Sequence, residues 1–102
     1  MYKCQKAYLV SESYENDNIG QNIATSMEVA VFCEIESITQ NEFFKAGQAG
    51  FKPELKAVVW SNEYHYERLI KIGGVIYSIY RTFERLDGKT ELYVERRSGK
   101  NG

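Results

Sequence analysis

The sequence predicts a mainly β fold, a small antiparallel β-barrel of about six strands with one short helix and a long loop between two strands. Three observations lead to this prediction. Short segments alternate apolar with polar residues, glycine-containing turn signals separate several of these segments, and a helical pattern occurs only once, near the middle of the chain. From the pattern alone, a two-sheet sandwich is an alternative to the barrel.

The first half of the chain holds two strand candidates, residues 7–15 and 23–37, which a polar loop over 16–22 connects. In the second candidate, one alternating set is Met27, Val29, Val31, Cys33 and Ile35, and the other is Glu28, Ala30, Phe32, Glu34 and Glu36. Because alternate residues of a strand point to opposite faces, we expect the first set to face the core. Cys33 is then a small apolar core residue.

The period changes after residue 37, where we expect a short helix. Thr39 can accept a hydrogen bond at the helix N-terminus, and Glu42, three residues later, can reach back to the amide of the cap. Gly47 is the expected helix end. Only about two turns fit before it, so the helix needs packing partners to be stable. Residues 47–53 contain two glycines and the only proline, and they predict an irregular loop before a strand over 55–61.

Two glycine-containing dipeptides organise the second half of the chain. Gly73-Gly74 separates residues 67–72 from residues 75–85, and Asp87-Gly88 separates the latter from residues 89–97. Glycine tolerates the positive φ that two-residue hairpin turns require. We therefore expect a three-stranded antiparallel meander with two tight turns.

The last strand of the meander shows a clear two-residue period. Leu92 and Val94 share one face, and Glu91, Tyr93 and Glu95 share the other. This alternation is typical of a strand with one face on the core and one face in solvent.

Length and composition indicate a single globular domain over residues 1–102, with flexible tails at 1–6 and 98–102. Hydrophobic residues make up 43% and charged residues 26%, which excludes a wholly disordered chain. The formal net charge of −1 excludes a globally basic nucleic-acid domain. The sequence has no membrane-length apolar run and no signal-peptide pattern, so we expect an intracellular chain with Cys4 and Cys33 reduced.

The residue types form no complete catalytic, cofactor-binding or metal-binding set, so we expect a protein that is not an enzyme. His65, the only histidine, lies in a connector beside Tyr64 and Tyr66, without a nucleophile motif or a nearby cysteine. The glycines at 47–50 and 73–74 lack the spacing of a phosphate-binding loop. An enzyme would require a pocket that joins His65 to a carboxylate.

Two sets of residues are candidates for contacts with other molecules. Glu34 and Glu36 share a strand face that is either solvated or turned toward a subunit. A second face is predicted to carry Tyr77, Ile79, Arg81, Phe83 and Arg85. Interleaved aromatics and arginines can stack bases and bind phosphates, which leaves a monomeric nucleic-acid-binding barrel as an alternative function. In the other interpretation, the aromatics build the core and the arginines pair with acids.

An ordered series of short motifs runs along the chain. The motifs are Ser37-Ile38-Thr39, Glu42-Phe43-Phe44, the Ala/Gly/Gln run over 46–50, Lys52-Pro53-Glu54, residues 77–82 and Glu91-Leu92-Tyr93. Their order over roughly residues 7–97 resembles the head-closure, or head–tail joining, proteins of long-tailed bacteriophages and prophages. No single motif is diagnostic, whereas the order of the motifs is fairly specific.

The resemblance implies a small β-barrel subunit that assembles as a ring, commonly of twelve copies, although such proteins are often monomeric in isolation. The ring sits under the portal and its adaptor, meets the tail or tail-terminator protein, and surrounds packaged double-stranded DNA. The implied location is the head–tail interface of the virion, and the host cytoplasm before assembly. Cofactors and membrane contacts are not expected.

In related stoppers, a long loop between two strands points into the channel and helps to retain DNA. Carried over to this sequence, the loop residues are Gln40, Phe43, Phe44, Lys45, Gly47, Gln48, Gly50, Phe51 and Lys52. The strand-face candidates Glu34, Glu36, Arg81 and Arg85 are possible subunit or DNA contacts in such a ring. The lysines of the loop could face phosphates, and its phenylalanines either seal the loop to a neighbouring subunit or pin it to its own barrel.

Overall fold

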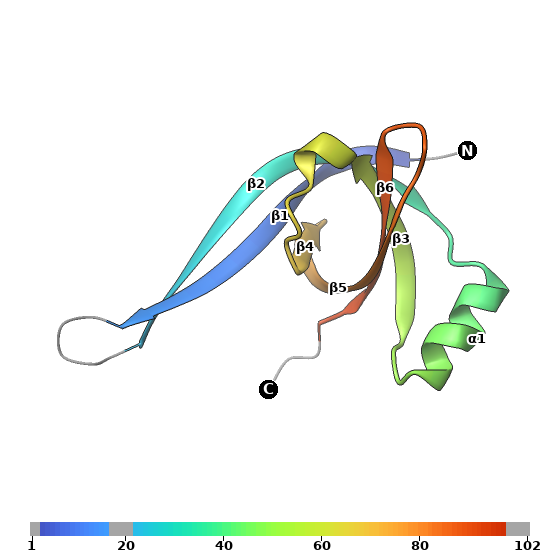
Figure 1. Cartoon of the computed structure of the whole chain (residues 1–102), viewed down its shortest axis with the longest axis horizontal. Helices are drawn as coiled ribbons and strands as arrows, with labels where there is room; N and C mark the ends of the chain where they lie inside the picture. Colours follow the sequence, from blue (N-terminus) through green and yellow to red (C-terminus); the bar gives the residue numbers. More distant parts are fainter. Residues whose placement is uncertain (1–2, 17–21, 98–102) are drawn as a thin grey trace.

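The computed structural model describes residues 3–16 and 22–97, which form a closed barrel of six antiparallel strands (Figure 1). The strands are β1 (Lys3–Asn16), β2 (Asn22–Glu36), β3 (Pro53–Trp60), β4 (Leu69–Ile72), β5 (Val75–Glu84) and β6 (Lys89–Arg96). Around the barrel their order is β1-β2-β3-β6-β5-β4. Helix α1 (Gln40–Gln48) precedes β3, and a single 3-10 turn, η1 (Ser61–Glu63), follows it. The predicted barrel with one short helix is confirmed, and the sandwich is excluded.

The interior of the barrel is the hydrophobic core, and every strand contributes to it. Leu9 of β1, Ile70 of β4 and Leu92 of β6 have no exposed surface. The other buried members of the cluster are Ala7, Val31, Cys33, Ala57, Val59, Ile72, Tyr77 and Val94. Burial raises the pKa of the Cys33 thiol to about 11, so this cysteine is a structural core residue, as predicted.

The predicted facing of β2 is confirmed for its second half only. Val31 and Cys33 are buried, and Ile35 packs against the core. Met27 and Val29, which were expected on the same inner face, are 67% and 46% exposed. The reason is topological, because β2 pairs with β3 only over its last three residues and its earlier part extends past the barrel.

The extra length of β1 and β2 forms a two-stranded arm, residues 11–16 and 22–29, that projects from the barrel (Figure 1). β1 pairs with β4 only from Ala7 to Val10, whereas its pairing with β2 continues to the end of β1. The longest extent of the molecule is 51 Å, against 30 and 24 Å in the other directions. The polar loop predicted over 16–22 is shorter, because residues 16 and 22 belong to the strands. Its centre, residues 17–21, lies outside the described residues.

The predicted N-terminal tail is wrong for residues 3–6. These residues are the start of β1 and pair with residues 32–35 of β2, so the ladder begins earlier than the apolar pattern indicated. Residues 1–2 and 98–102, the rest of the predicted tails, lie outside the described residues. Within the described ranges, no helix has the length and apolar character needed to cross a membrane.

Helix α1 begins as the sequence predicts and ends slightly later. Thr39 is the N-cap, and its Oγ1 accepts a hydrogen bond from the amide of Glu42 at 3.1 Å. The carboxylate of Glu42 bonds to side chains of β5 instead of reaching back to the cap. The helix passes Gly47 and ends in a Schellman arrangement, in which the Phe51 amide donates to a carbonyl of the last turn. Gly50, with φ of +93°, supplies the left-handed residue that this ending requires.

The β4–β5–β6 meander is confirmed, but only one of its turns has the predicted length. Gly73-Gly74 is a two-residue turn with φ of 58° and 81°, as a type I′ hairpin requires. In the second hairpin, the Arg85 amide donates to the Lys89 carbonyl at 2.7 Å, which leaves residues 86–88 as the loop. This turn is therefore a three-residue connection with Gly88 in the left-handed region, not the predicted two-residue turn.

A β-bulge in β5 contradicts the predicted common face of residues 77, 79, 81, 83 and 85. Tyr80 is an extra residue between Ile79 and Arg81 and has no partner in β6. One extra residue reverses the alternation of a strand. Tyr77 and Ile79 therefore pack in the core, whereas Arg81 and Phe83 lie exposed on the outside of the barrel.

The outer face of β6 is not solvated as predicted. Leu92 and Val94 point into the core, in agreement with the alternation. On the other face, Glu91 and Tyr93 are each only 8% exposed. The alternation places these two side chains correctly, but it does not show that α1 and long side chains of neighbouring strands cover them.

Candidate functional site

The segment between β2 and β3, residues 37–52, leaves the barrel and places α1 beside its outer surface (Figure 1). We call this segment the α1 excursion. The whole segment is described, and Ala46 is its only buried residue. The excursion contains all the residues predicted for the channel loop, and it is therefore the candidate functional site.

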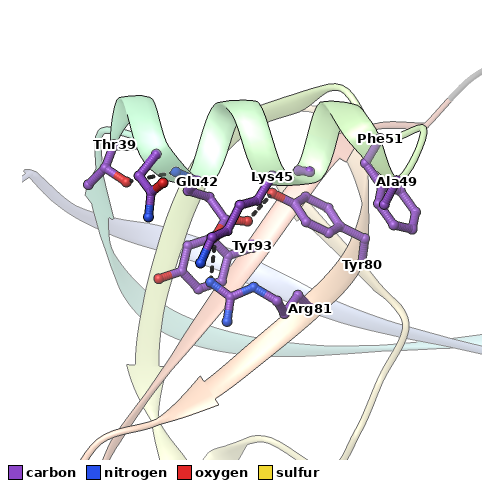
Figure 2. Close-up of a pocket in the computed structure, with 10 residues that line it drawn as sticks. Thr39, Glu42, Lys45, Ala49, Phe51, Tyr80, Arg81 and Tyr93 are labelled. Carbon is purple, nitrogen blue, oxygen red and sulfur yellow. Dashed lines mark hydrogen bonds and ion pairs between the residues drawn. The ribbon is translucent and has the colours of Figure 1, made fainter.

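A hollow of about 520 Å³ lies between α1 and the outer side of β5 and β6 (Figure 2). Its lining combines carboxylate, cationic and aromatic side chains. The lining residues are Thr39, Asn41, Glu42, Lys45, Ala46, Ala49, Phe51, Tyr80, Arg81 and Tyr93. The contacts between the excursion and the barrel are concentrated along this hollow.

Tyr80, the bulged residue of β5, is the centre of these contacts (Figure 2). Its hydroxyl donates to one carboxylate oxygen of Glu42 at 2.9 Å, and Arg81 Nη2 donates to the other at 2.6 Å. The ring of Phe51 stacks on the Tyr80 ring, with centroids 4.7 Å apart and planes 16° apart. Consecutive residues of a regular strand point to opposite faces. The bulge is therefore what allows both Tyr80 and Arg81 to reach the same carboxylate.

The contact between Glu42 and Tyr80 shifts the pKa values of both residues. Desolvation favours the neutral acid, but hydrogen bonds from Arg81 and Tyr80 outweigh it and lower the pKa of Glu42. Burial, together with the hydrogen bond to Glu42, raises the pKa of Tyr80 well above its usual value. Because the folded-state pKa of Glu42 is lowered, its stabilising contribution is present above the unfolded pKa and is lost as the pH falls through the folded pKa.

We predict a pH-dependent difference in stability between the wild type and Glu42→Gln. The amide cannot form the charge-assisted bond to Arg81, and since Arg81 is partly exposed the loss is about 1 kcal/mol at neutral pH. The difference shrinks toward zero in acid, where the wild-type carboxyl is protonated. Urea unfolding at neutral and acidic pH measures it, with the exposed Glu63→Gln as the control. The same difference in stability at neutral and at acidic pH would contradict the prediction.

A second polar cluster lies on the same outer surface, and we call it the outer ion network. Glu91 accepts from Arg85 Nε at 2.6 Å and from the hydroxyl of Tyr93. Glu36 pairs with Lys56 Nζ at 3.1 Å and with Arg85 Nη2 at 3.2 Å. The side chains of Glu36 and Glu91 are each 11% exposed, so these pairs are largely shielded from solvent.

The outer ion network joins the hollow beneath α1. The Arg81 guanidinium lies over the ring of Tyr93, 4.0 Å from its centroid. Burial and the hydrogen bond to Glu91 raise the pKa of Tyr93 to about 12. Desolvation opposes ionisation of Glu91, but the bonds from Tyr93 and Arg85 prevail and lower its pKa. Glu91 is therefore ionised and Tyr93 protonated at neutral pH.

The four predicted contact residues all form ion pairs within the chain. Glu34 pairs with Lys89 at 3.6 Å, Glu36 and Arg85 belong to the outer ion network, and Arg81 holds Glu42. The interpretation that the two arginines pair with acids is therefore confirmed. A phosphate at Arg81 or Arg85 would have to share the arginine with a carboxylate that is already bound.

The predicted loop residues separate into an anchored group and an exposed group. Phe51 stacks on Tyr80, and the Lys52 amide donates to Glu95 Oε1 at 2.9 Å. Phe43 and Phe44 are 55% and 60% exposed, and their rings contact each other edge to face. Of the remaining predicted loop residues, all are exposed: Gln40, Lys45, Gly47, Gln48 and Gly50. Phe51 therefore pins the excursion to its own barrel, whereas Phe43 and Phe44 do not.

His65 lies on the surface beside Glu67. Its side chain is 76% exposed, and Nδ1 lies 4.0 Å from the carboxylate of Glu67, which also accepts a bond from the His65 amide. Among the described residues, no group of three potential metal ligands occurs.

Sequence reasoning missed the residues that connect the excursion to the barrel, Tyr80 and Tyr93, as well as Lys56 and Glu91 of the outer ion network. The alternation in 77–83 contains no signal for the bulge at Tyr80. A sign for Glu91 and Tyr93 was present, since they share a strand face, but their burial depends on residues far away in the sequence.

Comparison of the chain with protein-family models and with curated protein sequences found no match.

Proposed function

We propose that this chain is a structural virion protein, a ring subunit of the head–tail connector that joins the DNA-filled phage head to the tail and helps to retain the packaged DNA. The ordered motifs that carry the resemblance to head-closure proteins run through the α1 excursion, from Ser37 to Glu54. The observation that carries the proposal is the form of this excursion. It is a helix and turn held beside a closed barrel, with its two adjacent phenylalanines directed away from the core.

The excursion has the properties that a channel element of such a ring needs. Glu42 and Phe51 tie it to its own barrel. Phe43 and Phe44 remain open to a neighbouring copy or to the tail. Lys45 and Lys52 are exposed, and ring symmetry would multiply these cations around the DNA phosphates. Exposed neighbouring aromatics are typical of contact surfaces.

The β1–β2 arm supports assembly from several copies. A two-stranded ribbon alone is marginally stable in water, and this arm exposes Met27 and Val29 and long unpaired strand edges. Such edges in a native protein are usually covered or paired. In the proposed ring, commonly of twelve copies, head-to-tail contacts between copies would cover them. The ring would lie beneath the portal and its adaptor and would receive the tail, without any catalytic step.

The proposal is tested with tail-less, DNA-filled heads that lack this protein. Wild-type protein added to them should protect the DNA from nuclease and restore tail attachment. The double variant Phe43→Ser/Phe44→Ser should fold normally, because both side chains are exposed, but should lose at least one of these activities. Leu86→Ser, a change at a fully exposed residue of the β5–β6 loop, is the control. Heads that gain neither protection nor tails from the wild-type protein would contradict the proposal.

The alternative function, a monomeric nucleic-acid-binding barrel, has less support in the geometry. Its two arginines, Arg81 and Arg85, are bound to Glu42, Glu36 and Glu91. Salt-sensitive binding of the isolated protein to DNA or RNA, abolished by changing these arginines, would favour it over the connector.

A further inference from the structure

The attachment of the α1 excursion depends on very few contacts. Ala46 is its only buried residue, and a helix of nine residues is unstable on its own in water. Glu42 and Phe51 both contact Tyr80, and Glu42 also accepts a hydrogen bond from the adjacent Arg81 at 2.6 Å. Lys52 adds a single backbone bond to Glu95, close to the start of β3.

The two ladder irregularities of the barrel lie where the excursion is attached. One is the bulge at Tyr80 in β5, and the other is the register shift between Pro53 and Leu55, where the excursion re-enters the barrel as β3. Bulges re-aim side chains and end regular pairing, and they are common next to functional sites. Here the first bulge turns Tyr80 toward α1, and the second lies at the joint between the excursion and the barrel.

The barrel itself does not need the excursion for its core. The core cluster consists of strand residues, and no residue of the excursion belongs to it in the described chain. Breaking the contacts of Glu42 and Phe51 with Tyr80 and Arg81 would therefore free residues 37–52 without opening the barrel. Segments with few buried contacts open separately from the rest of a protein, at a lower free energy than global unfolding.

We propose that Tyr80 is a latch residue: together with Arg81 it holds the α1 excursion against the barrel, and the excursion opens as one unit when the contacts of Glu42 and Phe51 with these two residues are broken. Tyr80 acts as a positioning residue, since it sets the place of Phe43 and Phe44 without contacting a partner itself. The opening is a property of the isolated chain, whereas its use in gating the channel rests on the proposed function.

Amide hydrogen exchange on the intact protein tests the latch. In the wild type, the amides of α1 should exchange faster than those of β6, because the excursion opens while the barrel stays closed. Tyr80→Phe removes one hydrogen bond from the closed state and should speed exchange in α1 about fivefold, with α1 still exchanging faster than β6. Phe51→Ala, which removes the stacked ring, should also speed exchange in α1. Tyr64→Phe is the matched control, since it deletes a tyrosine hydroxyl that donates to the Glu67 carbonyl elsewhere and should leave α1 unchanged.

A double-variant cycle shows whether Tyr80 and Glu42 act as one contact. Because both changes break the same hydrogen bond, Tyr80→Phe combined with Glu42→Gln should speed α1 exchange by less than the product of the two single effects. The latch is overturned by a common exchange rate for α1 and β6 in the wild type, by unchanged α1 exchange in Tyr80→Phe, or by independent effects in the cycle.

The exchange experiments and the test on DNA-filled heads distinguish a failure of the latch from a failure of the connector function. If the exchange results hold but the wild-type protein neither protects DNA nor restores tails, the latch stands and the connector function fails. If the heads respond as proposed but α1 exchanges only with the whole barrel, the connector function stands and the latch fails.

Discussion

Replacing Leu92 by alanine is expected to lower the free energy of unfolding by about 3 kcal/mol, since removing a fully buried leucine loses its transfer free energy and leaves a cavity. Leu92 has no exposed surface and lies in β6 at the centre of the barrel core. Urea unfolding, followed by circular dichroism, measures the change. For a domain of this size the loss is a large part of the total stability.

The control for Leu92→Ala is the same substitution at Leu86. This side chain is fully exposed at the tip of the β5–β6 loop, and substitutions at such positions change stability by no more than about 0.5 kcal/mol. Equal losses in the two variants would contradict the placement of the core inside the barrel.

Neutralising Glu91 is expected to have the second largest effect. Glu91→Gln removes the negative charge beside Arg85 and Lys56. It also leaves one acceptor oxygen for two donors, Arg85 Nε and the Tyr93 hydroxyl. Removing one member of a shielded ion pair costs more than the pair contributes, because the other charge stays desolvated. Since Arg85 remains 25% exposed, we expect a loss of about 2 kcal/mol, less than for a fully buried pair.

Two further variants distinguish the contribution of the Glu91–Arg85 ion pair from the cost of leaving one charge unpaired. Glu84→Gln, at an exposed position of the neighbouring strand, is the control and should be nearly neutral. The paired replacement Glu91→Leu/Arg85→Met should lose less stability than Glu91→Gln, because no unpaired charge remains. A double variant less stable than the single one would show that the ions themselves hold this surface together.

Several features of the molecule could be predicted because they depend on neighbours in the sequence. Thr39 caps α1 through a bond to an amide three residues away. Gly73-Gly74 makes a tight turn because glycine permits positive φ at both positions. Leu92 and Val94 face the core because a two-residue period fixes which side chains share a face.

The candidate site could be predicted as a segment but not as a structure. The change of period located the excursion between β2 and β3. Pairing of Arg81 and Arg85 with acids was one of two interpretations of these arginines. Three facts were not predictable in this way: the bulge at Tyr80, the burial of Glu91, and the exposure of Met27. Each depends on which strand lies alongside at that point, and the residues involved are far apart in the chain.

By itself, the sequence determined the class of the fold, the number of strands, the cap of α1 and the turn residues, because these follow from backbone preferences and from interactions within a few residues. Only the tertiary structure decided where β1 and β2 extend past the barrel, which face of β5 turns outward after the bulge, and that Glu42 anchors α1 to Tyr80 and Arg81. The physical reason is that the sheet closes into a barrel. A barrel fixes its register through pairings between distant strands, and a shift of one residue in such a pairing exchanges the inner and outer faces.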